Sequence, residues 1–90
     1  MSIHVQRQAE REFLDEIGVF SWPIWEAKAS EFPWKYETDE SCYFLEGAVT
    51  VTPEGGNPVE IGRGDYVTFP AGLNCQWRIK RAVRKHYRLG

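Results

Sequence analysis

The side chains that could carry out chemistry are few in this sequence of 90 residues, and they stand in stretches typical of β-strands. Glu40 and Cys42 are two residues apart, as are Cys75 and Trp77, so each pair shares one face of its strand. A carboxylate can serve as a general acid or base, and a thiol can serve as a nucleophile. Glu40 and Cys75 are therefore the candidate catalytic residues.

A metal centre needs more ligands than this pattern offers. A catalytic zinc is held by three protein ligands, whereas Glu40 and Cys75 supply two, and the phenol of Tyr36 seldom ionises at neutral pH. His4 lies in a polar amino-terminal stretch and His86 on a late strand, and neither belongs to a cluster with ligand spacing. We therefore predict no bound metal and no other cofactor.

The elements that position these residues are mostly strands. Residues 7–17 place apolar side chains at helical spacing and end before Gly18, which predicts one short amino-terminal helix. Short segments rich in β-branched and aromatic residues follow, separated by turn sequences. They predict strands at 22–25, 34–36, 41–45, 48–52, 59–61, 66–69, 75–79 and 84–87. Strands at this spacing favour an all-β barrel or jelly roll, with residues 1–19 as a helix or arm and 20–90 as the barrel domain.

Two motifs resemble those of a known family. Glu40 is followed by six residues and Gly47, and Gly64 is followed by five residues, Pro70-Ala71-Gly72, two residues and Cys75. These motifs resemble the cupins, whose histidines stand at the positions of Trp34, Tyr36 and Cys75 here. The stretches WPIWE at 22–26, CYFLEG at 42–47 and VRKHY at 83–87 are similar to stand-alone cupins related to the (S)-ureidoglycine aminohydrolase family. The resemblance implies a single cupin (RmlC-like) jelly-roll β-barrel.

The resemblance, combined with strand alternation, indicates which side chains share the barrel interior. The predicted interior set is Trp34, Tyr36, Glu40, Cys42, Cys75 and Trp77. We predict that Trp34, Tyr36, Cys42 and Trp77 bind a ligand, because a few polar groups in an apolar lining are typical of small-molecule sites. Alternatively, the rings pack together and close the pocket. Enclosure by rings disfavours the charged form of Glu40 unless Lys35 or Lys85 supplies a cation, in which case Glu40 is structural.

Composition limits the partners. The net charge of −2 does not favour nucleic acid, and no apolar run reaches membrane-spanning length, so we expect a cytoplasmic protein with reduced cysteines. Six Lys and Arg crowd the last thirteen residues and are expected to pair with the acidic amino-terminal half. Phe20, Trp22, Trp25 and Phe32 are expected to pack on the outer sheet face or to form a homodimer contact.

Three functions follow from these patterns. The leading hypothesis is a small cupin that binds a small metabolite in an aromatic pocket without a metal. The resemblance also implies an enzyme alternative, a ureidoglycine aminohydrolase-like or other lyase or isomerase with a weak metal site on Glu40, Cys75 and Tyr36. The third hypothesis is a non-catalytic interaction module with a closed core.

Overall fold

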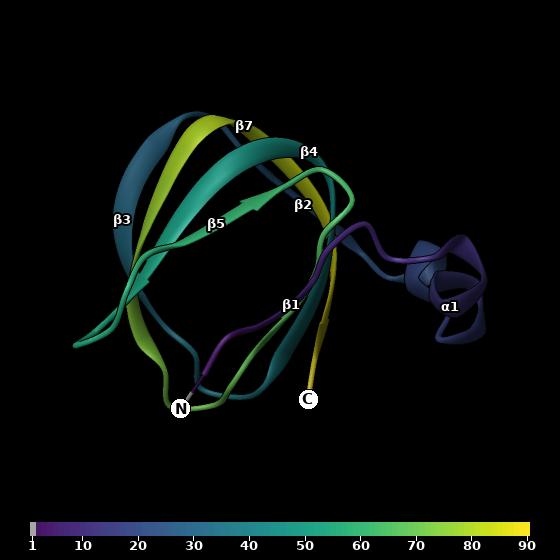
Figure 1. Ribbon diagram of the computed structural model, residues 1–90, viewed down its shortest axis with the longest axis horizontal. Coiled ribbons are helices and arrows are strands. Elements are labelled where there is room, and N and C mark those ends of the chain that lie inside the picture. The colour runs from purple at the N-terminus through teal and green to yellow at the C-terminus, as the bar shows by residue number, and fades with distance from the viewer. Residues whose placement is uncertain (1) are drawn as a thin grey trace.

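The computed structural model describes residues 2–90 and shows an antiparallel β-barrel (Figure 1). The strands are β1 (His4–Gln6), β2 (Ile24–Ala27), β3 (Ser30–Lys35), β4 (Glu40–Pro53), β5 (Val59–Gly62), β6 (Tyr66–Phe69) and β7 (Asn74–Leu89). The helix α1 (Arg11–Glu16) and a short 3-10 helix, η1 (Val19–Ser21), lie between β1 and β2. In Figure 1, α1 stands outside the barrel. The predicted all-β barrel with a short amino-terminal helix is confirmed.

The two long strands β4 and β7 form the frame of the barrel. They pair antiparallel from Glu40 opposite Leu89 to Pro53 opposite Cys75. The first half of β4 also pairs with β6, which pairs with β1, and its second half pairs with β5. β3 pairs with the first half of β7 and β2 with its second half. Each long strand therefore runs through both halves of the barrel, although the sequence predicted two separate strands in place of each.

A glycine allows β4 to bend at a corner between its two halves. The pairing of β4 with β7 is irregular between Phe44 and Val49, a feature of β-bulges, and Gly47 in this stretch has a φ of +116°. A Cβ atom at Gly47 would lie 2.8 Å from the Cα atom of Val83 on the facing strand. The motif glycine is therefore required both for its backbone conformation and for the close approach of β7.

The inner faces of the strands form the core, and a smaller cluster covers one outer face. The core includes Cys42 and Phe44, whereas their neighbour Tyr43 packs outside against the cluster of Leu14, Val19 and Trp22. The predicted helix at 7–17 is shorter, and the three residues of β1 were not predicted. No helix among residues 2–90 is long and apolar enough to cross a membrane.

The aromatic residues between positions 20 and 32 divide between the two faces of the barrel. Trp22 belongs to the outer cluster, as expected. Trp25 and Phe32 instead pack inside, where the Phe32 ring stacks on Trp77 at 6.0 Å and Trp25 meets it edge-on at 6.0 Å. The outer-face prediction is therefore wrong for these two residues, because Trp25 on β2 and Phe32 on β3 lie on the faces of their strands that point into the core.

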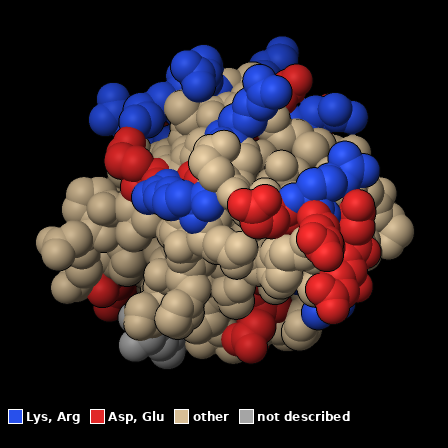
Figure 2. All heavy atoms as spheres, turned by 45° about the vertical axis from the view of Figure 1, so that its right-hand side comes forward, with Lys and Arg blue, Asp and Glu red and all other residues tan. Residues whose placement is uncertain are grey.

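Some of the basic residues on β7 form ion pairs with acidic residues of other strands. Lys80 pairs with Glu60, and Arg84 pairs with Glu26 at 2.8 Å. In Figure 2, the Lys and Arg side chains gather on the upper part of the surface, and Asp and Glu lie beside and below them. The expected pairing with the acidic amino-terminal half is confirmed for Arg84, whereas the partner of Lys80 lies in the carboxyl-terminal half of the chain.

Candidate functional site

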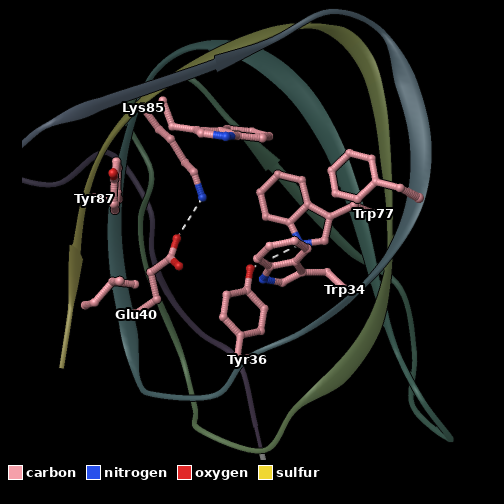
Figure 3. Close-up of a pocket in the computed structure, with 9 residues that line it drawn as sticks. Trp34, Tyr36, Glu40, Trp77, Lys85 and Tyr87 are labelled. Carbon is pink, nitrogen blue, oxygen red and sulfur yellow. Dashed lines mark hydrogen bonds and ion pairs between the residues drawn. The ribbon is translucent and has the colours of Figure 1, made fainter.

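A cavity of about 270 Å³ lies inside the barrel between β2, β3, β4 and β7 (Figure 3). Its lining residues are Trp25, Phe32, Trp34, Tyr36, Glu40, Trp77, Lys85, Tyr87 and Leu89. Trp34 and Leu89 are 50% and 62% exposed, whereas Tyr36, Glu40 and Lys85 are buried. The exposed side chains therefore form the rim of the cavity, and the polar groups lie inside it.

A buried ion pair stands on one wall. The Lys85 Nζ atom lies 2.9 Å from the Glu40 Oε2 atom, and the side chains keep only 6% and 11% of their exposure. The Cys42 thiol donates to the same oxygen at 3.1 Å, and the lysine also donates to the Cys42 Sγ atom at 3.3 Å. One carboxylate oxygen thus receives two donors, and the charges of the pair cancel.

Aromatic rings surround the lysine. The Lys85 Nζ atom lies 4.7 Å from the ring centre of Trp77 and 5.1 Å from that of Trp25, with Phe44 and Phe69 just beyond. Ring faces attract a cation, and desolvated contacts of this kind are worth about 2 kcal/mol. The rings and Glu40 together offset the cost of burying the ammonium group.

Tyr36 forms a second polar point in the cavity. Its ring stacks on Phe69 at 4.7 Å, and its hydroxyl accepts a hydrogen bond from the Trp77 Nε1 atom at 3.1 Å. Burial, and then the nearby Cys42 and Glu40, raise the pKa of Tyr36 well above its ordinary value. The hydroxyl therefore keeps its proton and can donate it in a hydrogen bond.

Neither thiol has the character of a nucleophile. Burial raises the pKa of Cys42 to about 12, although Lys85 partly opposes the shift. Burial also raises the pKa of Cys75 to about 11, and its thiol lies 3.5 Å from the backbone oxygen of Trp34. A thiol held protonated reacts poorly, because the thiolate is the reactive form.

The structure brings together four of the six predicted site residues. Trp34, Tyr36, Glu40 and Trp77 line the cavity, whereas Cys42 and Cys75 do not. Cys42 lies in the core and bonds to the ion pair, and Cys75 borders a separate depression beside Pro33 and Gln76.

Sequence reasoning proposed Lys85 only as one of two possible counter-ions and missed its place in the cavity wall. Lys35 is exposed, so Lys85 is the cation that compensates Glu40. Strand parity was the sequence signal for this choice. Lys85 and His86 are adjacent on β7 and point to opposite faces. The His86 Nδ1 atom lies 2.9 Å from the backbone oxygen of Trp22, outside the core, so Lys85 points inward.

The donor atoms do not fit the metal site that the cupin resemblance implies. Residues 2–90 contain no group of three or more His, Cys, Asp or Glu placed to hold a metal ion. The ammonium of Lys85 is already bonded to Glu40, the one carboxylate that lines the cavity. A metal cation at Glu40 would be repelled by this lysine.

Comparison with known proteins places the chain in a family. Residues 14–87 match the EutQ-like cupin domain. The structure of a DUF861 family protein from Thermotoga maritima is 48% identical, covers 99% of this chain and 100% of its own, and has a TM-score of 0.95. No curated protein matches the chain.

Two longer proteins share the fold. A putative ethanolamine utilization protein Q from Salmonella typhimurium is 28% identical, with 71% of this chain and 51% of that chain covered and a TM-score of 0.64. The EutQ protein of Clostridium difficile is 21% identical, with 94% and 64% covered and a TM-score of 0.66. From the family match and the relative from Thermotoga maritima, the chain belongs to the EutQ-like cupin domain family.

Proposed function

We propose that this protein binds a small metabolite in the aromatic cavity without a bound metal. The observation that carries the proposal is the cavity itself, which has a volume of about 270 Å³ and contains both apolar rings and a few polar groups. An engineered apolar cavity of about 150 Å³ suffices to bind benzene. The cavity therefore has room for a ring with a polar substituent, and it argues against the alternative of a closed core.

The ion pair explains how the site works without a metal. In a metal site, a cation neutralises the carboxylate and fixes its orientation. Here the Lys85 ammonium at 2.9 Å does both for Glu40. The wall of the cavity is therefore preorganised before any ligand enters, which lowers the cost of binding.

The test is a screen by protein-observed NMR with a library of fragments the size of a substituted benzene. We expect binders to shift the indole signals of Trp34 and Trp77, which line the cavity. Trp34→Ala should weaken these binders. Phe20→Ala is the matched control, because Phe20 is also an exposed ring, 39% exposed, but packs against Tyr43 and His86.

Two results would refute the binding proposal. The first is a screen in which no fragment shifts signals of the cavity residues. The second is an equimolar amount of manganese, iron or zinc in protein purified without chelator, with loss of that metal in Glu40→Gln.

A second candidate function is proton transfer in a lyase or isomerase reaction. It is favoured by the presence of a protonated hydroxyl on Tyr36 and a carboxylate on Glu40 in one cavity. The (S)-ureidoglycine aminohydrolase-like activity is the specific form that the sequence resemblance suggests. Incubation of the purified protein with (S)-ureidoglycine should then release ammonia, and Glu40→Gln should abolish the release. A protein that releases none is not such an enzyme.

We also propose that the protein forms a homodimer. Phe20 and Ile24 are large apolar side chains that remain 39% and 41% exposed, and Ile24 lies on the edge strand β2. Light scattering after gel filtration should give the mass of two chains, and Ile24→Lys should reduce it to one. A single-chain mass at all protein concentrations would exclude the dimer.

A further inference from the structure

We infer that the cavity selects an uncharged ligand that carries a hydrogen-bond donor next to an acceptor, as a carboxamide does. This inference rests on the proposed binding function and specifies its ligand class. Three features of the cavity support it: one free acceptor, one free donor and a balanced charge.

The free acceptor is the Oε1 atom of Glu40. Both hydrogen bonds of this carboxylate, from Cys42 and from Lys85, go to the other oxygen, Oε2. Among residues 2–90, no buried side-chain oxygen or nitrogen lacks a partner, so Oε1 is open to the cavity rather than enclosed by protein. A ligand N–H can therefore donate to it without displacing Lys85.

The free donor is the hydroxyl of Tyr36. It accepts from the Trp77 Nε1 atom, and none of the described residues accepts its own proton. Figure 3 shows the Glu40 carboxylate and the Tyr36 hydroxyl both turned toward the interior of the cavity. A ligand oxygen can accept from Tyr36 while a neighbouring N–H donates to Glu40.

Charge balance excludes ionic ligands. The Glu40 and Lys85 charges lie within 2.9 Å of each other and cancel, so the wall offers no net charge to attract an ion. A ligand carboxylate would lose its water shell and meet the negative charge of Glu40, and a ligand ammonium would meet Lys85. An uncharged amide pays neither cost and still satisfies both free groups.

Four probes of nearly equal size test the ligand class. They are benzamide, benzoate, benzylammonium and toluene, titrated separately at pH 7 while the shifts of the Trp34 and Trp77 indole signals are recorded. We expect benzamide to bind about tenfold or more tightly than each of the others, because a hydrogen bond to a charged group is worth about one to two powers of ten in affinity.

Two variants identify the groups responsible. Tyr36→Phe should weaken benzamide about tenfold, because it removes the donor, and leave toluene unchanged. The Trp34 indole signal is the readout for this variant, because the substitution also removes the acceptor of the Trp77 Nε1 proton. Tyr43→Phe is the matched control, since Tyr43 lies on the outer face of β4, away from the cavity, and its substitution should alter neither. Glu40→Gln leaves Lys85 without its counter-ion, so benzoate should then bind more tightly than benzamide.

The possible failures are distinguishable. If benzoate, benzylammonium or toluene binds the native protein as tightly as benzamide, the inferred ligand class is wrong and the binding function stands. If Tyr36→Phe leaves benzamide unaffected, the assignment of the donor is wrong. If none of the four probes shifts a cavity signal, the inferred ligand class is overturned, whereas the proposed function is overturned only if the fragment library also gives no binder.

Discussion

Replacing Lys85 by methionine removes one half of the buried ion pair and leaves Glu40 without a cation. The two side chains retain only 6% and 11% exposure, so water that enters the cavity compensates the orphaned carboxylate only in part. Breaking such a pair on one side costs about 3–5 kcal/mol. A chain of 90 residues has a total stability of roughly 5–13 kcal/mol, so the variant loses a large part of it.

The double variant Glu40→Met with Lys85→Met removes both charges and tests whether the loss in Lys85→Met comes from the orphaned carboxylate. Replacing both charges with apolar groups is often neutral or stabilising. We therefore expect the double variant to be more stable than Lys85→Met alone by about 2 kcal/mol or more. Urea unfolding followed by tryptophan fluorescence measures all three proteins, provided that the m-values agree.

Lys80→Met is the matched control for the loss of stability in Lys85→Met. Lys80 also pairs with a glutamate, Glu60, but both side chains are exposed, so this variant should unfold close to the native midpoint. The reasoning is refuted if Lys85→Met is as stable as Lys80→Met. It is also refuted if the double variant is no more stable than Lys85→Met.

Two further predictions concern the thiol and the corner glycine. Because burial raises the pKa of Cys42 from 9.0 to about 12, the unfolded chain releases this proton first as pH rises. The contribution of Cys42 to stability should therefore be full below pH 9 and fall by roughly 1 kcal/mol per pH unit up to about pH 12. Burial also raises the pKa of Cys75 to about 11 and adds to the fall in both proteins, so the test is that the stability of Cys42→Ala falls less steeply than that of the native protein when unfolding is measured across this range. Gly47→Ala should destabilise the fold by about 2 kcal/mol or more relative to Gly55→Ala in thermal unfolding, because both glycines have positive φ but only Gly47 faces backbone at 2.8 Å. Equal losses in the two glycine variants would exclude the steric argument.

The fold was predictable because its local signals agree with its topology. Alternation at Cys42 and Phe44, and again at Lys85 and Tyr87, marks the inner faces of β4 and β7. The continuity of each long strand was not predictable from local sequence. Gly47 has the positive φ that is typical of a turn, and a window of neighbouring residues cannot distinguish a turn from a bulge that bends one strand.

The site was predictable in part, and the missing part depends on register. Glu40 and Tyr36 could be assigned to the interior from the motif. Parity favours Lys85 as an inward residue, but its contact with Glu40 depends on the pairing of β4 with β7, which sets Phe44 opposite Lys85. Trp34 has the inward parity of Phe32 yet is half exposed, because β3 ends one residue later at the rim of the cavity. Parity predicts which face of the sheet a side chain points to, but it does not predict whether that residue lies deep in the barrel or at its rim.

The replacement of the motif histidines by Trp34, Tyr36 and Cys75 and the presence of Lys85 belong to one physical solution. A carboxylate inside a ring-lined barrel requires a cation, and removing the imidazoles of a metal site would leave Glu40 without one. Lys85 provides that cation from the facing strand, and the rings of Trp25 and Trp77 stabilise its ammonium group. Because Lys85 already balances the charge of Glu40, a ligand does not need to carry a charge of its own. The same exchange that disfavours a metal ion at Glu40 is therefore the physical basis of the ligand class that we propose for the cavity.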